Sequence, residues 1–456
     1  MKARAVLPVV FLLLSASALF AYDFGAVLDN ASSYGNQQTP SFSQKDKLSL
    51  WFTSGIGENL TFTGSASVQV WNVSPWFIFN PDLLNLTGNF PKIQGGPTLF
   101  SFTIGRYQES DFTGLVFSGQ SIDGFALGFT YPGAAVTVDL GYTGLTQKPL
   151  SYISMTQADA AAQGNSSIYF GSPRVLGRLQ VLLPGLFLRQ DLTLTALFQQ
   201  DLRSVFSGSN LIQPGSTTLV YGQGGSLDSE YLGAGLSGSI VENLYYKTYL
   251  YLETGRTLSY VTDQGSYQYE PILALLAGGG ARYYLDTLLH STFGLDFLYA
   301  SGDSRYSQVI EGDTGSGYAT AFVPVTSPPR LLSLAFSPNV ENIIAATFSY
   351  SIRPFAGAKS PELGNLQAVV KAIPMLRPTT GAVAAAEGLA PGAVSPSLPA
   401  NLTNLYLGSE FDMIVNYRPF SDLGVVLQGG LFAPNPNVFA DSAAIAYVEL
   451  DVSLSF

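Results

Sequence analysis

The chain has 456 residues, with 32 acidic and 21 basic side chains, 47 glycines, one histidine and no cysteine. Charged residues make up only 12% of it, against ~25% in an average domain, which excludes a disordered chain and a coiled coil. The lack of cysteine excludes disulfides and thiolate metal sites, and a single histidine excludes a zinc site built from several imidazoles.

Residues 1–21 have the features of a secretory signal peptide. Lys2 and Arg4 provide the positive start, Val6 to Leu14 the apolar stretch, and Ser15 to Ala21 the small residues before cleavage. An uncleaved membrane anchor would need ~20 apolar residues, whereas this run contains Pro8 and ends early. Without the two signal cations, 19 basic against 32 acidic side chains leave a net charge of −13, so the sequence predicts no nucleic-acid partner.

Beyond the signal, the longest apolar run lies near Ile272 to Ala281, where three glycines interrupt it. It is too short to span a bilayer as a helix. An exported, apolar chain without a spanning helix can satisfy its backbone hydrogen bonds in a membrane only as a closed β-barrel. The sequence therefore predicts an all-β, transmembrane, antiparallel up-and-down barrel.

Alternating polarity along the chain supports this interpretation, because each strand of such a barrel has one lipid-facing and one lumen-facing parity. In the last segment Ala444 to Phe456, every second residue is apolar, and the other parity is largely polar. The same alternation recurs near residues 174–183, 244–253, 289–299 and 407–418. The side chains it predicts to line the lumen are Arg174, Arg178, Asp191, Lys247, Glu253, Asp296, Asp412, Arg418, Glu449 and Asp451.

Connections between the predicted strands fall into short turns and long loops. Short ones include Gly55 to Asn59, Gln108 to Asp111, Ser118 to Ile122 and Pro419 to Asp422. The predicted long outer loops are residues 73–96, 144–173, 201–228, 302–340 and 374–403. We expect these loops to form the constriction of the pore, with 374–403 dispensable for folding.

Residues 22–456 therefore form one barrel domain in this interpretation. Counting from the C-terminus gives 18 strands, an even number as in bacterial single-chain barrels. Sixteen is the alternative, because 23–31 and 365–373 are the least periodic segments.

Several stretches resemble a known family. Thr103 to Gln108 followed by Asp123-Gly124-Phe125, and Tyr299 to Asp303, are similar to strand motifs of the alginate-export-type 18-stranded porins. Gly408 to Phe432 resembles that family's closing hairpin. Phe456 looks like the C-terminal signal read by the outer-membrane barrel-assembly machinery. The mixed charges of the predicted lumen differ from the strongly basic lumen that the resemblance implies for alginate exporters.

Catalytic and metal-binding alternatives have weaker support. His290 is predicted to lie in the lumen wall near a tight turn, without the partners that a catalytic base requires. Asp303, Glu311 and Asp313 are oxygen ligands of the kind Ca²⁺ prefers, but their spacing does not match a calcium loop. The sequence predicts no enzyme, no metal site and no cofactor.

Tyr245, Tyr249 and Tyr251 point inward on one predicted strand and could stack on sugar rings. The function predicted from these features is an outer-membrane channel of a diderm bacterium that passes small hydrophilic solutes, including sugars, by diffusion. The expected partners are outer-membrane lipid, the barrel-assembly machinery and those solutes; the oligomeric state is left open. Two alternatives remain: a substrate-specific, loop-plugged transporter, and a surface adhesin whose barrel displays its loops.

Overall fold

The computed structural model describes residues 22–36, 41–73, 75–93, 96–154, 170–187, 189–203, 213–218, 226–261, 263–304, 317–380, 403–439 and 443–456. The predicted signal peptide lies outside the described residues, and so do Glu311, Asp313 and most of the predicted loop 374–403. Within the described ranges, no helix is long and apolar enough to cross a membrane.

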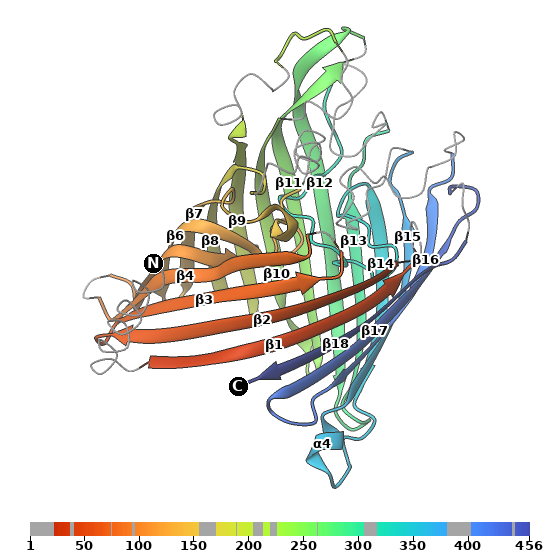
Figure 1. Ribbon diagram of the computed structural model, residues 1–456. Coiled ribbons are helices and arrows are strands. Elements are labelled where there is room, and N and C mark those ends of the chain that lie inside the picture. Colours follow the sequence, from red (N-terminus) through yellow and green to blue (C-terminus); the bar gives the residue numbers. More distant parts are fainter. Residues whose placement is uncertain are drawn as a thin grey trace, which may run out of the picture.

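The fold is one antiparallel sheet of 18 strands, and each strand is hydrogen-bonded to its neighbours in the chain (Figure 1). The strands are β1 Tyr22–Gly35, β2 Ser41–Ile56, β3 Leu60–Trp71, β4 Phe77–Pro91, β5 Leu99–Glu109, β6 Gln120–Tyr131, β7 Ala134–Tyr142, β8 Arg174–Phe187, β9 Gln190–Asp201, β10 Leu227–Val241, β11 Leu244–Val261, β12 Ser266–Leu285, β13 Ser291–Ala300, β14 Ile343–Ile352, β15 Gln367–Leu376, β16 Tyr406–Tyr417, β17 Leu423–Pro434 and β18 Ile445–Ser455. Within the described ranges two short helical turns accompany them, η2 Lys148–Leu150 and α4 Pro361–Gly364.

The sheet closes on itself through its first and last strands. β1 pairs with β2 on one side and with β18 on the other, in a register that runs from Val27↔Ser455 to Gly35↔Tyr447. Closure leaves no sheet edge with unpaired backbone groups, which is what a strand-built membrane protein requires. The prediction of an 18-stranded barrel is confirmed.

The two faces of the sheet differ in chemistry. On β13, Phe293, Leu295 and Phe297 are 46–49% exposed on the outside, whereas Asp296 lies on the inward parity between them. Leu48 and Leu50 on β2 are likewise exposed on the outer face, between inward Lys47 and Ser49. Large apolar side chains exposed strand after strand match a surface solvated by lipid tails.

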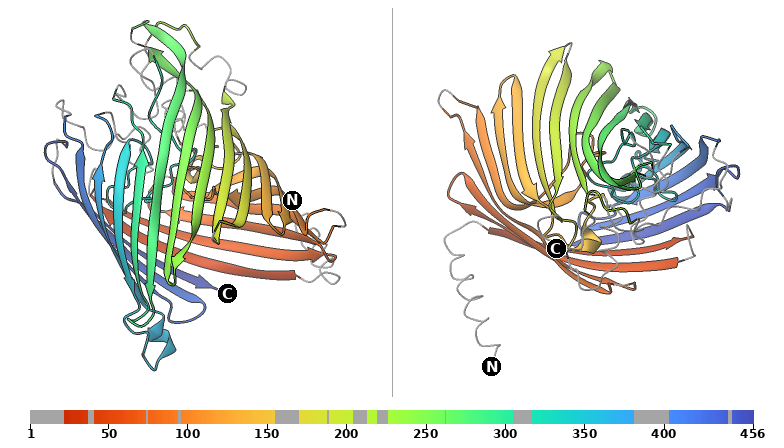
Figure 2. Two further views of the ribbon diagram at one scale, coloured as in Figure 1. Left: turned by 180° about the vertical axis from the view of Figure 1, so that it is seen from behind. Right: turned by 90° about the horizontal axis from the view of Figure 1, so that it is seen from above.

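The connections between strands differ in length between the two ends of the barrel. One end carries the start of β1, the end of β18 and short turns such as 57–59, 132–133 and 242–243, together with the α4 turn between β14 and β15. The other end carries the long connections between β7 and β8, β9 and β10, β13 and β14, and β15 and β16. Figure 2 shows the strands from behind and from above, with described loop segments inside the ring near β12 to β15.

The predicted connections are wrong in two regions of the chain. Residues 73–96 are not a long loop, because β4 occupies Phe77–Pro91 within them. Its Pro81, Asn85 and Gly88 resemble loop composition, but cross-strand pairing with β3 and β5 determines the structure here. Conversely, short turns at Gln108 to Asp111 and Ser118 to Ile122 predict a strand between them. The structure has no strand there, and residues 110–119 form one connection between β5 and β6. The two errors cancel, so the strand count was still correct.

Two residues of the family-like motif meet across neighbouring strands. Arg106 on β5 lies opposite Asp123 on β6, and their ion pair is 2.7 Å long. Arg106 also donates through Nη1 to the carbonyl of Pro81 at 3.0 Å. The motif therefore has a structural role here, which is to join β4, β5 and β6 near one end of the barrel.

The seam between β1 and β18 generates the first prediction. The Phe456 N–H donates to the Ala26 carbonyl at 2.9 Å, and the Ala26 N–H donates to the Phe456 carbonyl at 3.1 Å. Deleting Phe456 removes both bonds, each worth roughly 0.5–1.5 kcal/mol, and should reduce the heat-modifiable, folded protein recovered from outer membranes.

Phe456→Ala separates the two roles of this residue, because it keeps the backbone bonds and removes the ring. If the ring serves as an assembly signal, Phe456→Ala should lower the yield in cells but refold normally from urea into detergent. Normal assembly of the deletion in cells would contradict both roles.

Candidate functional site

A long segment of the chain lies inside the barrel. Residues 317–342, which we call the inward loop, connect to β14 and contain apolar side chains that are almost completely buried, including Phe322, Val325 and Phe336. Fully burying such a side chain contributes roughly 1.5–3 kcal/mol. This segment is therefore packed against other parts of the protein, and its role as the constriction of the pore stays a prediction.

One side of the inward loop is anchored to β10, β11 and β12. The carboxylate of Glu253 on β11 is fully buried and accepts the Val323 N–H at 2.8 Å. The Tyr231 hydroxyl on β10 donates to the Val323 carbonyl at 2.5 Å. Ala319 forms a β-bridge with Ile272 on β12. Both backbone polar groups of Val323 are thus satisfied by buried side chains of the wall.

The other side of the inward loop is anchored to β16 and β17. Glu410 is fully buried and accepts the N–H groups of Ala335 and Phe336, at 2.5 and 2.9 Å. The Phe336 ring stacks on Phe432 with centroids 4.4 Å apart. Gly430 on β17 allows the inward loop to lie this close to the wall, because a Cβ at this position would lie only 2.9 Å from the Ala335 nitrogen.

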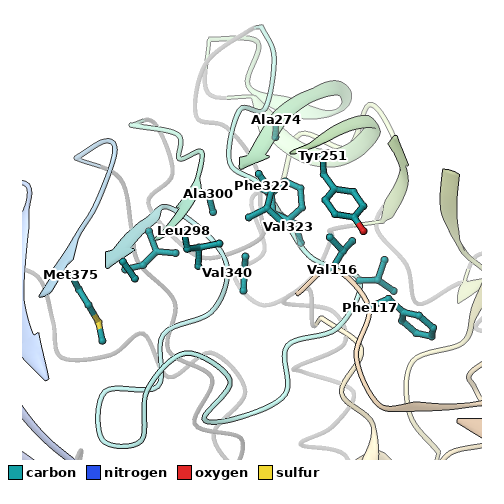
Figure 3. Packing of buried hydrophobic residues seen from close by; sticks show 14 of the residues in the cluster. Val116, Phe117, Tyr251, Ala274, Leu298, Ala300, Phe322, Val323, Val340 and Met375 are labelled. Carbon is teal, nitrogen blue, oxygen red and sulfur yellow. The ribbon is translucent and has the colours of Figure 1, made fainter. Parts of the chain in front are cut away.

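Two further connections join the inward loop from the opposite side of the barrel. Thr326 N–H donates to the Val116 carbonyl at 3.2 Å, and Ser118 N–H donates to the Thr326 hydroxyl at 2.7 Å. From the connection after β7, Ser154 N–H donates to the Val325 carbonyl at 2.9 Å. Figure 3 shows the packing that results, with Val116 lying near Phe322 and Val323. Three connections from distant parts of the sequence form one structure inside the lumen.

The connection 110–119 is held by a buried carboxylate of its own. Asp111 accepts the N–H of Phe117 at 2.8 Å and the Tyr251 hydroxyl at 2.7 Å. Phe112 stacks on the Tyr251 ring with centroids 5.4 Å apart. The predicted stacking track of tyrosines is therefore wrong in part, because Phe112 covers Tyr251, although Tyr245 is 51% exposed.

Arg178 on β8 is the centre of the ionic network nearest to that connection. Its Nη2 lies 2.7 Å from an Asp139 oxygen on β7 and 2.6 Å from a Glu109 oxygen on β5. Its Nη1 donates to the carbonyl of Ser110. One guanidinium thus joins β5, β7, β8 and the connection 110–119, and two carboxylates surround it.

The remaining predicted lumen residues divide by burial. Arg174 faces inward but is buried in a 2.8 Å ion pair with Asp201, so its charge does not reach the lumen. Glu253 and Asp412 are also buried. The inward side chains that keep some exposure are Asp191, Lys247, Asp296, Glu449 and Asp451.

Three predicted positions lie in turns or at their edge. Arg418 follows the last residue of β16 and is exposed at the short-turn end, so it is not a wall residue. Asp191 accepts the Gly185 N–H at 2.9 Å and so stabilises a turn. His290 lies in the turn after β12 with φ of 49° and is exposed, 3.6 Å from Asp286. Its alternation with neighbouring residues was misleading because the strand begins only at Ser291.

Several residues of the site were missed from the sequence. Alternation did place Glu410 on the inward parity beside Asp412, but Glu410 was not among the predicted site residues. Asp139 lies on an inward parity that alternation alone could have shown, whereas Glu109 was assigned to a turn. Asp303 accepts the Thr320 N–H at 3.1 Å, which gives it a role in the connection that leads to the inward loop. Among the described residues, no group of three or more His, Cys, Asp or Glu could hold a metal ion.

Comparison with known proteins identifies the fold. No family model matches the sequence, and no curated protein does. The outer membrane protein OpdK from Pseudomonas aeruginosa superposes with a TM-score of 0.55 at 13% identity, over 96% of this chain and 98% of OpdK. This chain has the fold of an 18-stranded outer-membrane porin.

Two other structures from the same organism agree. OpdQ gives a TM-score of 0.55 at 14% identity, over 95% of this chain and 97% of OpdQ. OccK2 (OpdF), solved in complex with glucuronate, gives 0.52 at 13% identity, over 95% of this chain and 98% of OccK2. At these identities the similarity establishes the barrel architecture, and the chemistry must come from this chain's own residues.

The Arg178 network generates the second prediction. Arg178→Gln should leave Asp139 and Glu109 close together without their cation, and removing one partner of a buried pair costs about 3–5 kcal/mol. We expect a lower midpoint in urea unfolding and a reversal potential shifted toward cations under a salt gradient.

The control is Arg256→Gln, which removes a guanidinium that is 55% exposed and paired with Asp228. An exposed pair contributes little, so stability should change by less than about 1 kcal/mol. Equal destabilisation by the two changes would contradict the central role of Arg178.

Proposed function

We propose that this protein is an outer-membrane channel through which small hydrophilic solutes diffuse, restricted by the inward loop. The observation that carries the proposal is the anchoring of this loop inside a closed barrel, by Glu253 on one side and Glu410 on the other. Barrels of 16–18 strands enclose a water-filled channel unless something narrows it, and here the inward loop narrows it. Selection then depends on width and on the side chains that line the remaining passage.

The loop geometry favours a restricted channel over an adhesin. An adhesin displays its loops to the outside, whereas the described part of the β13–β14 connection packs against the inner wall at Phe322 and Phe336. The anchors also support the substrate-specific transporter as a second candidate, because a fixed loop gives the passage one shape.

The sequence features support further details of this function. They favour export through the signal 1–21, assembly by the barrel machinery, and sugars among the solutes. The apolar outer surface of the barrel favours a lipid environment. The alginate-export type is supported by the motif that contains Arg106 and Asp123. The carboxylates around Arg178 count against a polyanionic substrate such as alginate.

The third prediction tests the channel and its restriction together. The purified full-length protein should give stable conductance steps in planar bilayers. Glu410→Ala removes the acceptor of two loop N–H groups, so the loop should detach from β16, and the steps should become larger and noisier.

Asp451→Ala is the matched control, since it also removes an inward carboxylate, but one that forms no hydrogen bond with the described part of the inward loop. Its conductance should stay near that of the parent protein. A silent parent protein would argue against the channel, and identical conductance in Glu410→Ala and the parent would argue against the loop as its restriction.

A further inference from the structure

The inner wall contains a small recess next to the Arg178 network. It has a volume of about 260 Å³ and lies between β5, β6, β7 and β8, bordered by Thr103, Thr137, Gln180 and the Phe112 ring. Gly128 on β6 makes room there, because a Cβ would lie 2.4 Å from the Ser101 hydroxyl. The volume is below the ~300–1,000 Å³ of pockets for drug-sized ligands, so it suits one small ring.

The hydrogen-bonding groups of the recess are mainly acceptors. Arg178 directs its Nε to Asp139 Oδ2 at 2.7 Å and its Nη2 to Glu109 at 2.6 Å, so its donors are engaged with the protein. Asp139 Oδ1 and Gln180 Oε1 are buried and accept no hydrogen bond from any residue that the structure describes. Asp139 itself is only 5% exposed. A buried acceptor without a donor is costly, so a ligand that supplies donors is favoured.

The charge of the recess restricts which donors suit it. Two carboxylates, Glu109 and Asp139, surround one guanidinium, which leaves an excess of one negative charge. A solute carboxylate would meet like charge and would find the guanidinium already paired. Hydroxyl groups can donate to and accept from the polar side chains that border the recess, Thr103, Thr137 and Gln180.

We propose that this recess is a binding subsite for a polyhydroxylated ring without an acidic group, such as a neutral sugar. The inference rests on the proposed channel function and specifies its solute class. The half-buried Phe112 ring borders the recess and offers an apolar edge to the carbon face of such a ring. The excess negative charge of this subsite would repel the carboxylate of a sugar acid. In this respect it differs from OccK2, a protein of the same fold that was solved in complex with glucuronate.

The test uses the full-length protein in planar bilayers with glucose, glucuronate and butylammonium as probes. Glucose should interrupt the single-channel current more strongly than glucuronate, which has the same ring and a carboxylate. Gln180→Leu and Thr137→Val should weaken the glucose block by about 2- to 10-fold, as expected for the loss of one hydrogen bond. Thr347→Val, on the inward face of β14 and outside the recess, is the control and should change the block by less than about twofold.

A second measurement separates this inference from the channel itself. Saturation-transfer NMR on the detergent-solubilised protein reports glucose binding whether or not the channel conducts, and heat-modifiable migration verifies that each variant is folded. If the protein does not conduct but binds glucose, and Gln180→Leu weakens this binding, the proposed channel function is wrong and the proposed subsite is supported. Stronger block by glucuronate or butylammonium than by glucose, or binding unchanged by Gln180→Leu, would overturn the subsite.

Discussion

Everything in this structure depends on satisfying backbone hydrogen bonds where water is absent. β1 must find β18 as well as β2, and the register from Val27↔Ser455 onward closes the ring. Once the ring is closed, alternate residues of every strand face lipid or lumen, and the outward parity becomes apolar. Chemistry that distinguishes one solute from another is therefore confined to the inward parity and to connections that fold into the barrel.

The same constraint explains why buried carboxylates hold the inward loop. A loop inside a barrel carries backbone N–H groups that neither a strand partner nor bulk water satisfies. Glu253, Glu410 and Asp111 accept such groups through their side-chain oxygens. Each of these buried side chains in turn needs those donors, since a buried polar group without a hydrogen bond is unfavourable. Loop and wall thus stabilise each other at a few fixed points.

The sequence could predict the parts of this structure that depend on periodicity. Parity placed Arg178, Glu253 and Asp296 inward, and the strand number was correct even though β4 was taken for a loop. It could not predict that Arg178 pairs with Asp139 and Glu109, because that depends on the register between strands distant in the chain. The inward loop was equally inaccessible: Phe322 and Phe336 lie in a stretch without alternation, and their burial depends on strands up to a hundred residues away.

Register and lumen electrostatics are determined by the same side-chain pairs. Arg178 lies directly opposite Asp139 and Arg174 opposite Asp201, and each forms an ion pair with the residue opposite. A slip of one residue would break each pair and would turn charged side chains toward lipid, at about 2–4 kcal/mol for an arginine near the midplane. Because Arg174 and Arg178 are each paired with carboxylates, these two cations contribute little net positive charge to the lumen. Width and hydrogen bonding, more than attraction of anions, are then the properties by which this barrel can select a solute.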